Sequence, residues 1–270
     1  MKKIVMAFMM MFMIVPIPAL AEVLDLEAII NNVEKAVHDG QAGSRRVSFT
    51  VKDGERITGE WIARAAHKKF NGENRSLMVI MKPENIKGTG HVFWKQDSKT
   101  ISQWVYYPNT RRVRNLSRST IYESFLGTDF TYADFGFQDP GGTYKLLGEE
   151  NYAGAEAIKI ENIPRETWYY SKIVSWISAD TFLPIKHDYY DSTGSLWKTK
   201  LIENIVIVNN VPMPLRIRMI DVQQNRSTEI IISDVCADVE YLTKEDFDPE
   251  KLPTATLSPV CTLRPASKKK

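Results

Sequence analysis

The sequence has 270 residues, 43% of them hydrophobic and 25% charged, which is enough for one large domain or two smaller ones. It has 35 basic and 33 acidic residues, and removing Lys2 and Lys3 with the leader described next leaves 33 of each (35 − 2 = 33). This balance argues against a general nucleic-acid-binding protein, because such proteins need a basic excess to displace counterions from phosphates.

The first residues have the pattern of a cleaved secretion signal. Lys2 and Lys3 precede an apolar, Met-rich run over residues 4–20, and the small residues Ala19 and Ala21 mark a cleavage site. A membrane anchor is the alternative, but a spanning helix needs about 20 uninterrupted apolar residues and two prolines interrupt this run. We therefore expect residues 1–21 to be removed and the protein to reach the periplasm.

The first element after the leader is predicted to be an amphipathic helix over residues 24–37. Apolar residues recur at helical spacing at positions 26, 29, 30, 33 and 37, and Gly40 follows as a stop signal. Such a helix is expected to lay one apolar stripe on the rest of the domain.

The remaining chain is mostly predicted to form strands, because apolar and polar residues alternate between turn signals such as Asp53-Gly54 and Asn71-Gly72. Many strands joined by short turns indicate an antiparallel meander, which has to curl to protect its edges and bury one face. We expect the early helix to fill the concave side and to leave an apolar cavity. The expected strands are 47–52, 57–66, 77–81, 91–95, 100–107, 111–116, 144–149, 157–162, 172–178, 185–190, 196–208, 211–222 and 227–239.

The strand pattern breaks between residues 117 and 140. Residues 119–127 are predicted to form a short helix, and residues 128–137 are rich in aromatic side chains without strand alternation. Such a segment is expected to pack on an apolar surface, and it is the best candidate for a lid.

Two runs resemble the outer-membrane lipoprotein-sorting-like proteins, which are relatives of the periplasmic lipoprotein carrier LolA and its outer-membrane receptor. They are residues 104–114 (WVYYPNTRRVR) and residues 123–135 (ESFLGTDFTYADF). The resemblance implies a mainly β (α+β) fold, in which an incomplete, half-open antiparallel β-barrel wraps around the N-terminal helix and a short helical lid. It also implies a cavity that accepts acyl chains. We expect one such domain over residues 22–255 and a tail over 256–270.

The two cysteines, Cys236 and Cys261, both follow the leader. In an oxidising periplasm they can form a disulfide, which would partly tether the tail and contribute roughly 3 kcal/mol in the chain-entropy model. Two unpaired thiols are the alternative. Their spacing differs from C-x-x-C, which argues against a catalytic dithiol.

The sequence shows no pattern of catalytic or metal-binding residues. The four histidines lack zinc spacing, and the nucleophile elbow, P-loop and dinucleotide motifs are missing from the sequence. Glu123, Asp129, Asp134 and Asp139 cluster near the predicted lid, where solvated loop carboxylates or helix caps are a simpler explanation than paired catalytic acids. We predict a protein that is not an enzyme, without cofactor or metal.

Large apolar side chains on the strands and in the lid are the candidates for lining the cavity, and ordinary core packing is the alternative for each. The ligand-binding candidates are Phe49, Val51, Trp61, Val79, Met81, Trp94, Trp104, Phe125, Phe130, Tyr132, Phe135, Trp176, Ile217 and Met219.

Arg112 and Arg114 are predicted to share one face of a strand. They are candidates for contact with an anionic headgroup or a protein partner, and a solvent-facing strand with ordinary ion pairs is the alternative.

Together these features predict a monomeric periplasmic carrier of a hydrophobic ligand, a lipid or the acyl chains of a lipoprotein, that binds no nucleic acid. The resemblance further implies that this carrier meets an inner-membrane transporter. A non-carrying module that docks on such a transporter is the second hypothesis. A hydrolase, motivated only by the acidic cluster with Asp129 and Asp134, is the third.

Overall fold

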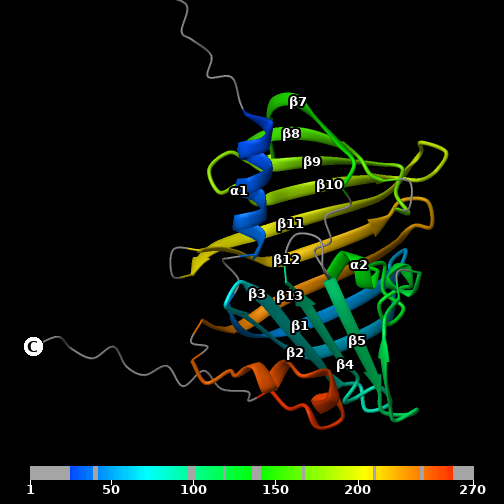
Figure 1. Ribbon diagram of the computed structural model, residues 1–270. Coiled ribbons are helices and arrows are strands. Elements are labelled where there is room, and N and C mark those ends of the chain that lie inside the picture. Colours follow the sequence, from blue (N-terminus) through cyan, green and yellow to red (C-terminus); the bar gives the residue numbers. More distant parts are fainter. Residues whose placement is uncertain are drawn as a thin grey trace, which may run out of the picture.

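A computed structural model describes residues 25–38, 42–96, 101–117, 119–135, 141–165, 168–208, 211–237 and 240–257. Within these ranges the chain forms a 13-stranded antiparallel sheet that curls without closing into a barrel (Figure 1). The predicted mainly β fold, with an incomplete barrel around helices, is therefore confirmed. The predicted leader, residues 1–21, and the tail beyond residue 257 lie outside the described residues.

The helical elements and the strands have the following bounds. The helices are α1 (Leu26–His38), η1 (Thr120–Tyr122), α2 (Tyr132–Phe135), η2 (Lys244–Phe247) and η3 (Pro249–Thr254), where η marks a 3-10 helix. The strands are β1 (Gly43–Asp53), β2 (Arg56–Phe70), β3 (Glu73–Lys82), β4 (Gly90–Lys95), β5 (Ile101–Tyr107), β6 (Arg112–Asn115), β7 (Thr143–Tyr152), β8 (Ala155–Ile163), β9 (Lys172–Ser178), β10 (Pro184–Tyr190), β11 (Leu196–Val208), β12 (Val211–Asp221) and β13 (Arg226–Cys236).

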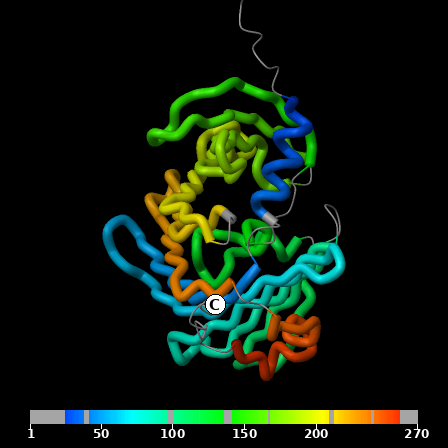
Figure 2. The backbone as a smooth tube through the Cα atoms, turned by 90° about the vertical axis from the view of Figure 1, so that its left-hand side faces the viewer, coloured from blue at the N-terminus to red at the C-terminus, as the bar shows by residue number. Residues whose placement is uncertain are grey.

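The sheet consists of two meanders. Its strand order is β6-β5-β4-β3-β2-β1-β13-β12-β11-β10-β9-β8-β7, so β1–β6 and β7–β13 each pair in sequence order and meet where β1 pairs with β13. We call β1–β6 the N-terminal half and β7–β12 the C-terminal half, with β13 at the join. The two halves arch around a common concave side (Figure 2).

Helix α1 crosses the concave side of the C-terminal half (Figure 1). Asp25 caps its first turn by accepting a hydrogen bond from the Glu27 amide at 3.1 Å. Ile29 is buried against Ile158, Ile160 and Ile177 of the sheet. The apolar stripe predicted from the sequence therefore attaches this helix to β8 and β9.

The N-terminal half is covered on both faces. On β3, Leu77 and Val79 pack against Phe247 and Leu252 of the C-terminal 3-10 helices. Ile80, the residue after Val79, belongs to a second cluster on the concave face, which contains the aromatic side chains after β6. Because strand side chains alternate between faces, this half has two apolar surfaces, each with its own cover.

The segment from residue 117 to residue 135, which we call the lid, is not the helix predicted over 119–127. Within residues 119–127 only Thr120–Tyr122 is helical, as the 3-10 helix η1. Leu126 and Gly127 have positive φ angles of 51° and 77°, which turn the chain back on itself, and a β-bridge joins Ser124 to Thr131. The helix ends early because the chain reverses to place Phe125 and Phe130 in the core.

Candidate functional site

The concave side of the C-terminal half contains a cavity of about 370 Å³. It lies between α1, strands β7–β11, the end of the lid and the loop that precedes β9. This volume is at the lower end of the range for pockets that hold one small ligand, roughly 300–1,000 Å³. The lining residues are Ile30, Val33, Glu34, Val37, Lys95, Ala133, Asp134, Tyr144, Ile160, Asn162, Trp168, Tyr170, Ile173, Ser175, Ile177, Pro184, His187, Tyr189 and Lys200.

Most of the cavity wall is apolar because of the periodicities of its elements. Ile30, Val33 and Val37 lie three and four residues apart along α1, so they form one stripe. On β9 the odd-numbered residues 173, 175 and 177 line the cavity, whereas Trp176 packs on the opposite face of the sheet. The helix and the strand therefore contribute apolar walls from two sides.

A row of three polar side chains interrupts the apolar surface. Ser175 of β9 pairs with His187 of β10, which pairs with Lys200 of β11. Side chains directly opposite each other on neighbouring strands share one face, and all three line the cavity. The Ser175 hydroxyl and His187 Nδ1 are hydrogen-bonded at 2.8 Å.

Burial changes the protonation of the basic members of this row. It lowers the pKa of His187 to about 3, with a further contribution from the Lys200 charge, so His187 is neutral at neutral pH. Burial also lowers the pKa of Lys200, while the Asp134 carboxylate opposes this shift. The cavity therefore disfavours positive charge, and the Lys200 ammonium is costly to keep there.

A second pair of charges links α1 to the N-terminal half. Lys95 at the end of β4 donates a hydrogen bond to the Glu34 carboxylate of α1 at 3.2 Å, and Lys95 is buried. Both residues line the cavity. This ion pair fixes the C-terminal part of α1 over the site.

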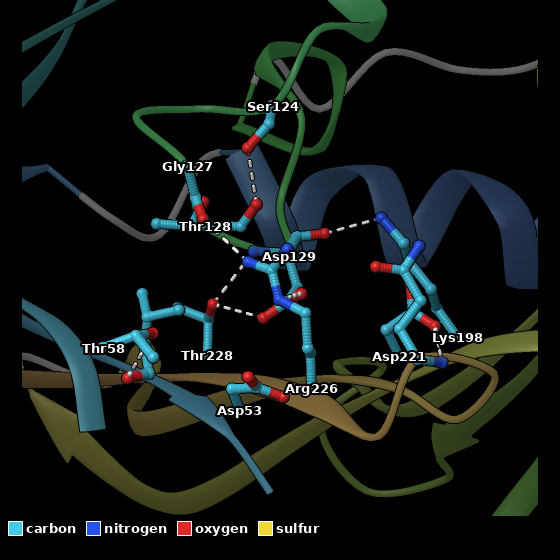
Figure 3. A network of polar contacts seen from close by, with 12 residues as sticks. Asp53, Thr58, Ser124, Gly127, Thr128, Asp129, Lys198, Asp221, Arg226 and Thr228 are labelled. Carbon is cyan, nitrogen blue, oxygen red and sulfur yellow. Dashed lines mark hydrogen bonds and ion pairs between the residues drawn. The ribbon is translucent and has the colours of Figure 1, made fainter. Parts of the chain in front are cut away.

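The lid is tied to the sheet through Asp129, which is buried (Figure 3). The Asp129 amide donates to the Thr228 hydroxyl at 2.9 Å, and this hydroxyl donates to the Asp129 carboxylate at 2.7 Å. Lys198 donates to the Asp129 carbonyl at 2.7 Å, and Arg226 donates to the Gly127 carbonyl at 3.0 Å. Burial raises the pKa of Asp129, and the Thr228 hydrogen bond partly offsets this shift.

The end of the lid is joined to the loop before β9. Asp134 accepts hydrogen bonds from the Thr131 amide at 2.7 Å, the Thr131 hydroxyl at 2.9 Å and the Tyr169 hydroxyl at 3.2 Å. Tyr169 stands between Trp168 and Tyr170, which both line the cavity. The Asp134 carboxylate therefore has three donors and holds two parts of the cavity wall together.

Eight of the predicted ligand contacts meet in one cluster on the concave face, beside the cavity. Phe125 lies 6.0 Å from Phe49, 5.3 Å from Tyr132 and 4.6 Å from Phe135 between ring centroids. These rings fill the space between the lid and the N-terminal half. The eight residues are Phe49, Trp61, Phe125, Phe130, Tyr132, Phe135, Ile217 and Met219.

The other predicted contacts lie elsewhere. Val79, Trp94 and Trp104 belong to the cluster under η2 and η3, and Trp176 lies on the outer face of the C-terminal half. Val51 is buried on β1, and Met81 is exposed. Among the described residues that line the cavity, none of the fourteen candidates occurs, so their role as ligand contacts stays a prediction.

Arg112 and Arg114 lie on β6 at the edge of the sheet, and both are exposed.

Cys236 is buried and takes part in a disulfide bond. Its predicted partner, Cys261, lies outside the described residues, so this pairing stays a prediction.

The sequence interpretation missed most of the residues that line the cavity. Consecutive aromatics at residues 168–170 were a usable signal, because such a run in a loop packs on an apolar surface. No local signal marks the row Ser175, His187 and Lys200, because it depends on the register of three strands.

The polar row lacks the features of a hydrolytic site. A histidine with a pKa of about 3 is a poor general base at neutral pH, although its Nδ1 is hydrogen-bonded to a serine. No group of three or more metal-ligating side chains occurs among the described residues.

In the same part of the chain, no helix combines the length and apolar character needed to span a membrane.

Comparison with known proteins relates the chain to one family and to several solved structures. A family model described as "Uncharacterized protein" matches residues 72–254, about two thirds of the chain. No curated protein matches the chain.

Three solved structures have a similar fold. A domain described as an outer membrane lipoprotein-sorting protein, from Vibrio parahaemolyticus, is 23% identical with a TM-score of 0.76, covering 84% of this chain and 97% of that one. A DUF1329 family protein from Desulfovibrio piger is 24% identical with a TM-score of 0.73, covering 84% and 98%. A LolA superfamily protein from Nitrosomonas europaea is 19% identical with a TM-score of 0.61, covering 82% and 96%. The resemblance seen in the sequence is therefore confirmed at the level of the fold.

Proposed function

Because the chain belongs to the family whose model matches residues 72–254 and has the fold of the lipoprotein-sorting and LolA superfamily proteins, we propose that it is a periplasmic carrier of a hydrophobic ligand. The ligand is a lipid or the acyl chain of a lipoprotein, and it occupies the cavity beneath α1. The observation that carries the proposal is the apolar hollow of about 370 Å³ between α1 and the C-terminal half of the sheet.

The energetics of an alkyl chain in water favour such a role. Each exposed methylene costs about 0.8 kcal/mol, so a chain of sixteen carbons carries on the order of 12 kcal/mol. A protein that shields the chain while it crosses an aqueous compartment needs apolar walls more than it needs reactive groups. The stripe on α1 and the inward residues of β9 supply such walls.

A carrier is favoured over a hydrolase by the state of the polar residues. The neutral, half-buried His187 is poorly suited to remove a proton at neutral pH. Asp129 and Asp134, which motivated a hydrolase, are engaged in hydrogen bonds that attach the lid to the sheet and to the loop before β9. We therefore assign these two acids a structural role.

The second candidate, a module that docks on an inner-membrane transporter, is motivated by β6. This edge strand exposes Arg112 and Arg114 without a neighbouring strand on its outer side in the described part of the chain. The two roles are compatible, since a carrier also has to meet a donor or an acceptor. Charge reversal of Arg112 and Arg114 that abolishes capture of the transporter but leaves ligand uptake intact would assign docking to this edge.

The remaining parts of the proposal concern the whole chain. We propose that residues 1–21 are a cleaved leader, that residues 22–255 form one domain, and that a disulfide between Cys236 and Cys261 tethers the tail. The protein then works as a monomer, and its ligand is exchanged with a membrane-bound partner.

The proposal is tested by purifying the full chain from its own periplasm and analysing bound molecules by native mass spectrometry. We expect a co-purifying lipid that is lost in Val33→Trp, which fills the cavity from α1. Asn31→Trp, on the exposed face of the same helix, is the matched control and keeps the lipid. Wild-type protein without any extractable lipid, and with no uptake of added acyl chains, would contradict the carrier role.

A further inference from the structure

Lys200 differs from the other charged residues that line the cavity. Glu34 and Lys95 neutralise each other, and the Asp134 carboxylate accepts three hydrogen bonds. The Lys200 ammonium has neither a hydrogen bond nor an ion pair within the described residues. It lies on β11 in the middle of the sheet, away from either edge.

Its surroundings compensate this charge only in part, because the Asp134 carboxylate attracts Lys200 without forming an ion pair with it. Lys200 is half-buried and lines the cavity, and the residues directly opposite it are His187 on β10 and Met219 on β12. His187 is neutral, as its low pKa shows, and Met219 is fully buried and apolar. An unpaired ammonium in such a place is costly, and an anion brought by a ligand would remove this cost.

We propose that Lys200 binds the carboxylate of a single-chain amphiphile inside the cavity, so that the ligand is a free fatty acid. This inference rests on the proposed function and names the class of ligand for the same site. The carboxylate forms an ion pair with Lys200, and the adjacent Ser175–His187 pair supplies polar neighbours in the same row. The alkyl chain lies along the apolar stripe of α1.

Charge and volume favour this class over other acyl-bearing molecules. One ammonium without an ion pair matches one carboxylate, whereas a phosphate monoester carries about −1.5 to −2 charges at neutral pH. An esterified acyl chain of a lipoprotein brings no charge at all. The volume of about 370 Å³ is also small for several acyl chains held together.

The test compares laurate, dodecyl phosphate and dodecanol, three ligands with the same chain length and different headgroups. Binding to the full, delipidated chain is measured by displacement of the neutral probe N-phenyl-1-naphthylamine. Because a charge-assisted contact in a partly buried site is strong, we expect laurate to bind about ten- to a hundredfold more tightly than dodecanol. We expect dodecyl phosphate to bind more weakly than laurate.

Variants assign this preference to Lys200. Lys200→Met should bind laurate and dodecanol equally well, and Lys200→Arg should keep most of the preference for laurate. Lys186→Met is the matched control, because Lys186 lies on the outer face of β10, over the Trp176 ring and paired with Asp188. It should behave as the wild type does.

The outcomes separate this inference from the carrier role. Equal binding of laurate and dodecanol by the wild type, or a laurate preference that survives in Lys200→Met, overturns the role of Lys200 and leaves the carrier role standing. Tighter binding of dodecyl phosphate than of laurate overturns the carboxylate in favour of a phosphate headgroup. Failure of all three ligands to displace the probe contradicts both proposals.

Discussion

The two halves of the sheet share one antiparallel pattern, but the concave side of the N-terminal half is packed whereas that of the C-terminal half contains a cavity. The lid covers the N-terminal half with rings whose centroids lie 4.6 to 6.2 Å apart. Helix α1 covers the C-terminal half with isoleucine and valine side chains. Aromatic side chains bury about 150–250 Å² each, so the lid fills its space and the shorter aliphatic side chains of α1 do not.

The difference shows that a curled sheet does not by itself make a binding site. Whether a cavity remains depends on the length of the side chains on the element that covers the concave face. The segment that the sequence marks as a lid is the filled part, fixed to the sheet through Asp129, Thr228 and Lys198 (Figure 3). The cavity lies under the helix, which carries the less conspicuous residues.

The largest expected effect comes from removing a ring in the packed half. Phe125→Ala should lower the free energy of unfolding by about 3–5 kcal/mol, because it adds a new void to the loss of apolar burial. Ile173→Ala, which enlarges a cavity that already exists, should cost about 2 kcal/mol, close to the transfer term for three carbon atoms. Urea unfolding followed by tryptophan fluorescence measures both. A cost for Phe125→Ala no larger than that for Ile173→Ala would show that the two halves are packed alike.

The sequence predicts those features of the fold and the site that depend on residues close together in the chain. The strands predicted over residues 172–178 and 196–208 have the observed bounds of β9 and β11, and the 3.6-residue period predicts α1. The face on which a residue lies is harder to assign. Both faces of β9 carry large apolar residues, so the pattern does not reveal that Ile173 and Ile177 face the cavity whereas Trp176 faces outward.

The candidate site depends on contacts between distant parts of the chain. Val33 and Ile160 line the same cavity although more than a hundred residues separate them. Lys200 meets His187 only because β10 and β11 pair in one particular register, and a shift of one residue would turn it to the outer face. Periodicity within a segment contains no information on register between strands or on the helix that covers them.

The next effect concerns one histidine in each half whose pKa is lowered by desolvation. Burial lowers the pKa of His91, in the packed half, to about 4, so the unfolded chain binds a proton near pH 6.5 that the folded protein does not. The stability that neutral His91 contributes is present above pH 6.5 and is lost as the pH falls towards 4. For a pKa shift of this size, the free energy of unfolding decreases by about 3 kcal/mol. His91→Gln should therefore flatten the decrease in unfolding free energy between pH 6.5 and 4.

His187 is the matched comparison in the half with the cavity. Burial lowers its pKa further, to about 3, so the difference between its folded and unfolded pKa values is at least as large as for His91. We therefore expect His187→Gln to flatten the pH dependence at least as much as His91→Gln does. Urea unfolding at several pH values measures this, and a smaller effect for His187→Gln would indicate that water enters the cavity and hydrates the charged ring.

The smallest expected effect has the opposite sign. Lys200→Met replaces an unpaired, half-buried ammonium with an apolar side chain of similar length, so it should stabilise the ligand-free protein by about 1 kcal/mol. Lys186→Met should not stabilise, because Lys186 is already paired with Asp188 at 2.8 Å and stacked on Trp176. Thermal unfolding of delipidated samples compares the two variants. If Lys200→Met is more stable and loses the preference for laurate, the C-terminal half gives up folding free energy at the position where the ligand binds. If Lys200→Met is less stable, the attraction of Asp134 outweighs the cost of burying the ammonium in the empty protein.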